Sequence, residues 1–129
     1  MAKRKPVFKV DSYGTYAPWD GQKGDVPKIL KIGTKVLFHP EVEFGLVLNI
    51  KGGKGIKLDF RVIHPPFKGT DGKPAPDFVG EHYVNANTWQ FFLGDTVWEP
   101  FEDKIGTWQF IISYEGQIIA DKRLELIMP

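Results

Sequence analysis

The sequence has no cysteine, only two serines, and no apolar run that approaches the length of a membrane helix. Without cysteine the chain cannot form a thiolate nucleophile or bind a metal through sulfur, and it needs no oxidising compartment to fold. A membrane helix needs about 18 consecutive apolar residues, and no stretch comes close to that length. These absences exclude thiol chemistry and predict a domain without a membrane span.

The chain also has almost no excess of charge of one sign, because the formal net charge of the 129 residues is only +1. Residues 1–35 contain eight Lys or Arg and three Asp, whereas residues 36–129 contain nine basic and thirteen acidic side chains. A nucleic-acid-binding domain is usually strongly basic, so we expect a solvated basic segment and no nucleic-acid partner. The basic residues 1–6 are followed by Val7, Phe8 and Lys9 rather than by the apolar core of a signal peptide, so we expect a cytoplasmic protein.

Fourteen glycines and ten prolines interrupt the chain too often for long helices, and apolar residues recur with period two, which predicts strands. The clearest alternation covers residues 44–50 and 56–62, which are joined by the glycine-rich residues 51–55. We predict an antiparallel hairpin with a five-residue loop, in which Ile50 faces Ile56 and Leu48 faces Leu58. The even-numbered apolar side chains of both strands would then share one face.

Other strand patterns cover residues 7–16, residues 28–38 with an interruption at Gly33, and residues 81–93 with a bulge near Asn87. Residues 17–28 and the proline-rich residues 65–76 predict loops, and residues 95–103 suit an irregular crossing between sheets. A C-terminal hairpin brings the count to about seven strands, with no helix. Short strands separated by turn signals predict a single domain, residues 1–129, that folds as an all-β, two-sheet antiparallel sandwich.

Residues 106–126 give the sharpest prediction of register. Alternating apolar side chains occupy even-numbered positions on both strands of this hairpin: Trp108, Phe110, Ile112 and Tyr114, then Ile118, Ala120, Leu124 and Leu126. A two-residue loop would pair even with odd positions, whereas a three-residue loop at residues 115–117, or an equivalent bulge, pairs Trp108 with Leu124. Lys122 would then lie opposite Phe110, with its alkyl chain covering the ring and its ammonium in water.

The same segment, which begins at Gly106-Thr107-Trp108, resembles the last two strands of many bacterial immunoglobulin-like domains. In those domains the first of the two strands begins with the pattern glycine, any residue, tryptophan, any residue, phenylalanine. A turn that contains glycine and a strand of alternating apolar and polar residues follow. Further motifs make the chain similar to one short bacterial family described only as a domain of unknown function: Ile32-Gly33-Thr34, Phe44-Gly45 and His64-Pro65. The resemblance spans most of the chain and implies an immunoglobulin-like sandwich, but without the two cysteines that bridge the sheets of antibody domains. Its motifs are glycines at turns and aromatics in a core, so it implies no functional residue.

Patterns typical of catalysis or metal binding are few. The histidines His39, His64 and His82 are not spaced as metal ligands, and the first two precede proline, which favours a structural role at a strand end. Acidic residues cluster twice but have no apolar neighbours that would raise a pKa: Glu41 and Glu43, then Glu99, Glu102 and Asp103. The sequence contains no nucleophile-elbow or phosphate-loop motif. We expect no enzyme activity, no metal and no cofactor.

Aromatic residues make up 14% of the chain, and Trp89 and Trp108 fall on apolar strand faces. Four aromatic residues in loop contexts are the candidates for an exposed ligand-binding patch: Tyr16, Trp19, Trp98 and Phe101. The leading hypothesis is a non-catalytic module that binds a protein partner or a second copy through a loop face or an unpaired edge strand. The alternative is a carbohydrate- or small-ligand-binding sandwich that uses the loop aromatics.

Overall fold

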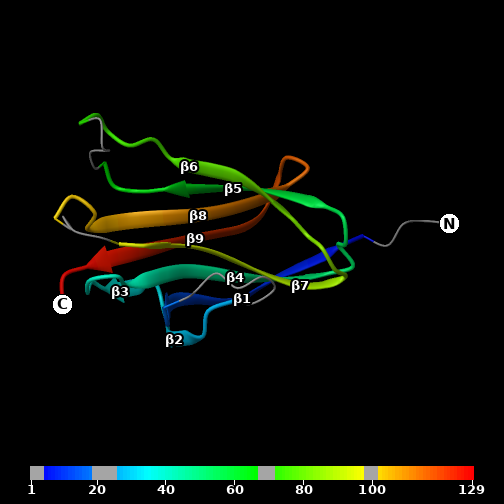
Figure 1. Ribbon diagram of the computed structural model, residues 1–129, viewed down its shortest axis with the longest axis horizontal. Coiled ribbons are helices and arrows are strands. Elements are labelled where there is room, and N and C mark those ends of the chain that lie inside the picture. The colour runs from blue at the N-terminus through cyan, green and yellow to red at the C-terminus, as the bar shows by residue number, and fades with distance from the viewer. Residues whose placement is uncertain (1–4, 19–25, 67–71, 98–101) are drawn as a thin grey trace.

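The computed structural model describes residues 5–18, 26–66, 72–97 and 102–129, and within these ranges the chain forms nine strands and no helix (Figure 1). The strands are β1 (Val7–Tyr16), β2 (Ile29–Ile32), β3 (Lys35–Leu37), β4 (Glu43–Lys51), β5 (Lys57–Ile63), β6 (Phe78–Tyr83), β7 (Thr88–Thr96), β8 (Gly106–Tyr114) and β9 (Gln117–Ile127). The described residues therefore include no helix that could cross a membrane. The predicted all-β class is confirmed, with nine strands in place of about seven.

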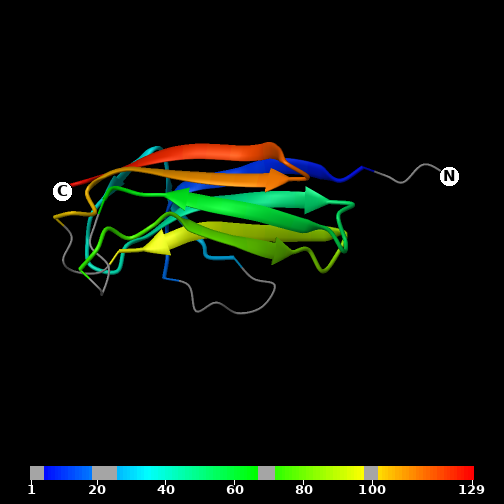
Figure 2. The same ribbon diagram turned by 90° about the horizontal axis from the view of Figure 1, so that it is seen from above.

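The strands form two sheets that stack face to face (Figure 1, Figure 2). The four-stranded sheet has the order β2-β1-β4-β7, and the five-stranded sheet has the order β3-β9-β8-β5-β6. Paired strands are antiparallel except β3 and β9, which run parallel. The predicted two-sheet sandwich is therefore confirmed.

The main core lies between the sheets and contains a cluster of aromatic rings. Trp108 is only 1% exposed, and its ring meets that of Phe44 edge-on with the centroids 5.2 Å apart. Phe110 makes a similar contact with Phe44 at 5.8 Å. Burial of each side chain contributes about 1.5–3 kcal/mol, and an edge-on ring pair adds about 0.5–1.5 kcal/mol. The indole N–H of Trp108 donates a hydrogen bond to the carbonyl of Lys104 at 2.9 Å, so this buried donor is satisfied.

The predicted hairpin of residues 44–50 and 56–62 is wrong, because β4 and β5 belong to different sheets. The connection between them arches across one end of the sandwich. Two backbone hydrogen bonds hold this arch, from the Gly52 N–H to the Asn87 carbonyl and from the Gly55 N–H to the Val84 carbonyl, each at 2.7 Å. Even-numbered residues of both strands do face the core, but from opposite sides. Alternation identifies the buried face of a strand and not the sheet that contains it.

Two other predicted strands are each divided between the sheets. Residues 28–38 form β2 in the four-stranded sheet and β3 in the five-stranded sheet. Residues 81–93 contain the end of β6 and most of β7, which also lie in different sheets, and a turn occupies the position of the predicted bulge. An interruption in an alternating pattern is equally compatible with a bulge and with a crossing. The crossing between sheets predicted for residues 95–103 is confirmed in that β7 and β8 lie in different sheets. Its predicted start is wrong, because β7 includes residues 95 and 96, and residues 98–101 lie outside the described residues.

The C-terminal hairpin of β8 and β9 has the predicted register. Trp108 pairs with Leu124, and Phe110 pairs with Lys122. The ammonium of Lys122 lies 4.5 Å from the centroid of the Tyr13 ring, so this lysine also makes a cation–π contact with the opposite sheet. The parity argument therefore correctly predicts the pairing of this hairpin.

The register arises from a bulge rather than from a three-residue loop. The turn contains two residues, Glu115 and Gly116, and the pairing shifts by one residue after Ile112. This shift reverses the side-chain direction near the turn. Ile118, which the pattern places in the core, is 60% exposed, and Ile119 packs against the core instead.

Candidate functional site

Three of the four aromatic residues predicted to form an exposed patch, Trp19, Trp98 and Phe101, lie outside the described residues. Tyr16 lies at the end of β1 and is only 2% exposed. Its ring packs edge-on against Phe92, with the centroids 4.9 Å apart. The prediction that Tyr16 belongs to an exposed loop patch is therefore wrong.

Tyr16 belongs to a second, smaller core on the outer face of the four-stranded sheet. This outer core consists of three buried side chains and two partly buried ones that pack against them: Tyr16, Val47 and Phe92, with Val26 and Ile29. The pairing of β1 with β4 shifts between Val10 and Ser12, which reverses the side-chain direction along β1. The sequence pattern does not reveal this bulge, so Tyr16 is easily mistaken for a loop residue.

The Tyr16 hydroxyl lies 2.8 Å from the hydroxyl of Ser12, which is also buried. Burial raises the pKa of Tyr16 to about 12, because removal from water disfavours the phenolate. The phenol is therefore neutral at physiological pH. Its position and its partner make Tyr16 an anchor of the outer core, against which Val26 and Ile29 pack.

His82 lies in a half-buried aromatic cluster between β6 and β7. Its ring stacks on Phe91 with the centroids 4.0 Å apart and the planes 10° from parallel. Its Nε2 accepts a hydrogen bond from the indole N–H of Trp89 at 2.9 Å. Burial lowers the pKa of His82, since the charged ring is disfavoured away from water. The neutral ring with its proton on Nδ1 is the form that accepts this bond.

The acidic residues make contacts that connect strands or turns. Glu43 accepts a hydrogen bond from the Thr96 hydroxyl at 3.0 Å, and burial raises the pKa of the neighbouring Asp95. Glu41 is exposed in a turn with a φ of 64°. Within the described ranges no group of three or more His, Asp or Glu side chains is arranged to hold a metal ion. Glu99, a member of the second predicted acidic cluster, lies outside those ranges.

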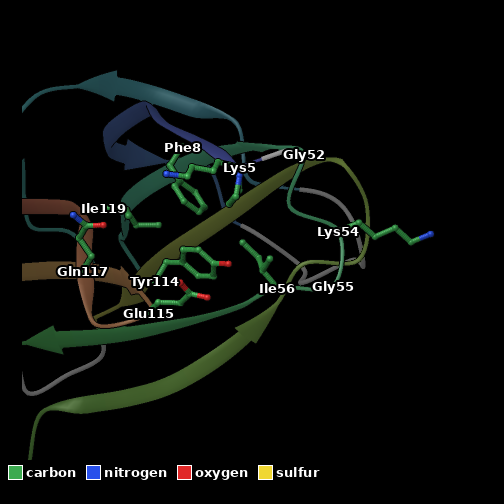
Figure 3. Close-up of a pocket in the computed structure, with 11 residues that line it drawn as sticks. Lys5, Phe8, Gly52, Lys54, Gly55, Ile56, Tyr114, Glu115, Gln117 and Ile119 are labelled. Carbon is green, nitrogen blue, oxygen red and sulfur yellow. The ribbon is translucent and has the colours of Figure 1, made fainter. Parts of the chain in front are cut away.

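A cleft of about 830 Å³ opens at the end of the sandwich where β1 begins (Figure 3). We call it the end cleft. Its lining comes from three segments that are far apart in the sequence: the start of β1, the arch between β4 and β5, and the turn between β8 and β9. Its apolar walls and polar rim are formed by Phe8, Ile56, Tyr114 and Ile119, and by Lys5, Lys54, Glu115 and Gln117.

Two aromatic rings contact each other in the end cleft. The rings of Phe8 and Tyr114 lie 5.6 Å apart and tilted by 55°. Partial burial, the charge of Glu115 and a hydrogen bond to its carboxylate raise the pKa of Tyr114. The Tyr114 phenol is therefore protonated and polar, on a wall that is otherwise apolar.

A second candidate site is the edge of the five-stranded sheet at β6, which pairs with β5 alone among the strands that the structure describes. Val79 and Tyr83 are 65% and 60% exposed, and Phe78 is 38% exposed. We call these three residues, with the backbone between them, the β6 edge. Glu81 on the same strand forms an ion pair of 2.6 Å with Lys57 of β5, and this hydrogen bond raises the pKa of Lys57.

Neither site follows from the sequence motifs. The residues of the end cleft come from distant segments that only the tertiary structure brings together. The apolar side chains of β6 are visible in the sequence, but the predicted strand of residues 81–93 combines part of β6 with β7, and this conceals the edge.

No curated protein sequence matches the chain significantly. The crystal structure of an immunoglobulin-like protein from Pseudomonas aeruginosa is similar to the chain, with a TM-score of 0.75 and 16% sequence identity. The similarity covers 98% of this chain and 100% of the other. At this level of identity it shows the fold alone, which is an immunoglobulin-like sandwich. A family model described as "Domain of unknown function (DUF3859)" matches residues 4–126, so the chain belongs to this family, as its sequence motifs implied.

Proposed function

We propose that the chain is a non-catalytic interaction module that binds an extended segment of a protein along the β6 edge. The observation that carries this proposal is the combination of a sheet edge that, within the described residues, pairs only with β5 and two strongly exposed apolar side chains, Val79 and Tyr83. Addition of a strand to such an edge is a recurrent way to bind an extended peptide. The bound strand would come from another protein or from a second copy of the chain.

The backbone of β6 is oriented for strand addition. Val84 donates its N–H to the carbonyl of Ile56 on the β5 side, and its own carbonyl accepts from Gly55. Backbone groups of an antiparallel strand point alternately to either side, and the pairing of β5 with β6 has no shift. The N–H and C=O groups of Val79, Glu81 and Tyr83 therefore point away from the sheet.

The β6 edge also lacks protection that is common on edge strands. Natural edges are often shortened, or they carry lysine, proline or a bulge that prevents association. The six residues of β6 include no lysine or proline, and their pairing with β5 is regular. By contrast, the edge strand β3 has only three residues and β2 only four. The remaining edge strand, β7, has nine residues but none of the large exposed hydrophobic side chains. Among the four edge strands, β6 thus combines sufficient length with strongly exposed apolar side chains.

A proline at position 79 tests the proposal directly. The Val79 N–H points away from β5, so Val79→Pro removes no hydrogen bond of the β5–β6 pairing but blocks an added strand. Val79→Thr keeps both the N–H and the β-branched shape and is the matched control. Val79→Lys provides a second blocking variant if the proline variant is unstable.

The assay selects extended peptides from a displayed random library against the wild-type chain, and sedimentation equilibrium measures self-association in parallel. We expect binding or dimer formation by the wild type and by Val79→Thr, and its loss in Val79→Pro. Amide exchange should slow at Val79, Glu81 and Tyr83 in the bound state. A monomeric wild type that selects no peptide, or equal binding by the proline variant, would refute the proposal.

We further propose that the module works in the bacterial cytoplasm. A bacterial protein shares its fold, and a chain without cysteine needs no oxidising compartment. Fractionation of bacterial cells that express the chain from its own locus tests this location, and recovery from the periplasm or medium would contradict it.

A further inference from the structure

The end cleft exposes apolar side chains on a concave surface. Phe8, Ile56, Tyr114 and Ile119 are partly buried, pack against the main core and also line the cleft. Figure 3 shows these side chains converging from β1, from the connection between β4 and β5, from β8 and from β9. Small-molecule sites are typically clefts of about 300–1,000 Å³ with mainly apolar walls and a few polar groups. The end cleft has this size, and its lining combines apolar side chains with about as much polar surface.

Hydrogen bonds hold the walls of the end cleft in place. The arch between β4 and β5 is held by the bond from the Lys54 N–H to Asn87 Oδ1 at 3.2 Å and by that from the Ile56 N–H to the Gly53 carbonyl at 3.0 Å. On the opposite wall, the bulge in β9 directs Ile119 into the cleft. A ligand would therefore meet a surface that is already formed, which reduces the entropy cost of binding.

One cation at the rim is placed to meet an acidic group. The rim carries two ammonium groups, on Lys5 and Lys54, and one carboxylate, on Glu115. In Figure 3 the Lys5 side chain lies beside Phe8 at the cleft, whereas the Lys54 side chain extends away from it. Glu115 interacts with the Tyr114 phenol. Lys5 is thus the cation best placed to meet an anionic group of a bound molecule.

We propose that the end cleft binds a small molecule with an aromatic or branched apolar body and a single acidic group. The body packs against Phe8, Tyr114 and Ile119, and the acidic group lies near Lys5. This site is separate from the β6 edge, and its occupant is a small molecule rather than a protein segment.

Two fluorescent probes test the apolar part of the site. Anilinonaphthalene sulfonate has an aromatic body and one acidic group, and phenylnaphthylamine is its neutral counterpart. We expect the sulfonate to bind the full chain with one-to-one stoichiometry and more tightly than the neutral probe. Ile119→Ser should weaken binding of both probes at least about tenfold, since it removes apolar wall surface. Ile118→Ser, at the exposed neighbouring position, is the matched control and should leave binding unchanged.

Charge reversal tests the acidic part of the site. Lys5→Glu should weaken the sulfonate by about threefold or more at low salt and leave the neutral probe unchanged. Lys9→Glu makes the same change at an exposed position outside the cleft and should have no effect. Lys5 is exposed, so this arm remains informative if Ile119→Ser fails to fold. Absence of one-to-one binding, equal losses at positions 118 and 119, or an unchanged sulfonate affinity in Lys5→Glu would overturn the proposal. Val79→Pro should bind both probes as the wild type does.

Discussion

Removal of the Tyr16 hydroxyl should destabilise the domain by about 1–3 kcal/mol. Tyr16→Phe leaves the ring in the outer core but deprives the buried Ser12 hydroxyl of the partner that lies 2.8 Å away. A buried polar group that loses its partner costs about 1–3 kcal/mol, whereas removal of both partners costs less than the sum. Ser12→Ala should cost only about 0.5–1.5 kcal/mol, because the Tyr16 hydroxyl retains an interaction with the Val47 backbone.

A double-mutant cycle measures the coupling between these two hydroxyls. Urea unfolding at neutral pH, followed by circular dichroism, gives the free energy of unfolding for the wild type, both single variants and the double variant. We expect the double variant to lose about 1 kcal/mol less than the sum of the single losses. Tyr83→Phe, at a position 60% exposed, is the control and should change stability by less than about 0.5 kcal/mol. Additive losses, or a neutral Tyr16→Phe, would refute a buried hydroxyl pair.

Three further changes test the cores. The pKa of His82 is lowered by burial, so the unfolded chain takes up this proton first as pH falls below about 6.5, and stability should decrease with acidification; His82→Gln should flatten this decrease in thermal melts. Trp108→Ala should lower the free energy of unfolding by about 3–5 kcal/mol in urea titrations, because it empties the centre of the core. Gly45→Ala would place a Cβ 2.2 Å from the Leu93 carbonyl oxygen, so it should lower the melting temperature far more than Gly116→Ala, where the space is open and only a positive φ of 78° is strained.

The sequence predicts most reliably those pairings in which neighbouring strands belong to one sheet. The register of β8 and β9 follows from side-chain parity, because a slip by one residue would expose Trp108 and Phe110. The same parity argument fails for β4 and β5, since two strands on opposite sides of a core also present the same set of residues to it. A short connection does not distinguish a hairpin from an arch, and the glycines of residues 51–55 permit both.

Bulges limit how well the alternation of apolar and polar residues predicts candidate sites. The bulge in β1 moves Tyr16 to the outer core, and the bulge in β9 exchanges the roles of Ile118 and Ile119. Each inserts a single residue, and no glycine or proline marks its position in the sequence. The end cleft depends on one of these bulges, and the β6 edge depends on the division of a predicted strand between two sheets. Both candidate sites therefore arise from tertiary structure rather than from a local motif.

The parallel pairing of β3 with β9 affects when the domain can fold. Lys35 pairs with Glu125 and Leu37 pairs with Ile127, so residues of β3 acquire these partners only when β9, about 90 residues further along, is available. Contacts between such distant residues slow folding, because a long loop must close before they stabilise anything. During synthesis β3 would remain without this partner until β9 has been made. A chain shortened by its last few residues should accordingly lose the cooperativity of the whole sandwich rather than fray at one end.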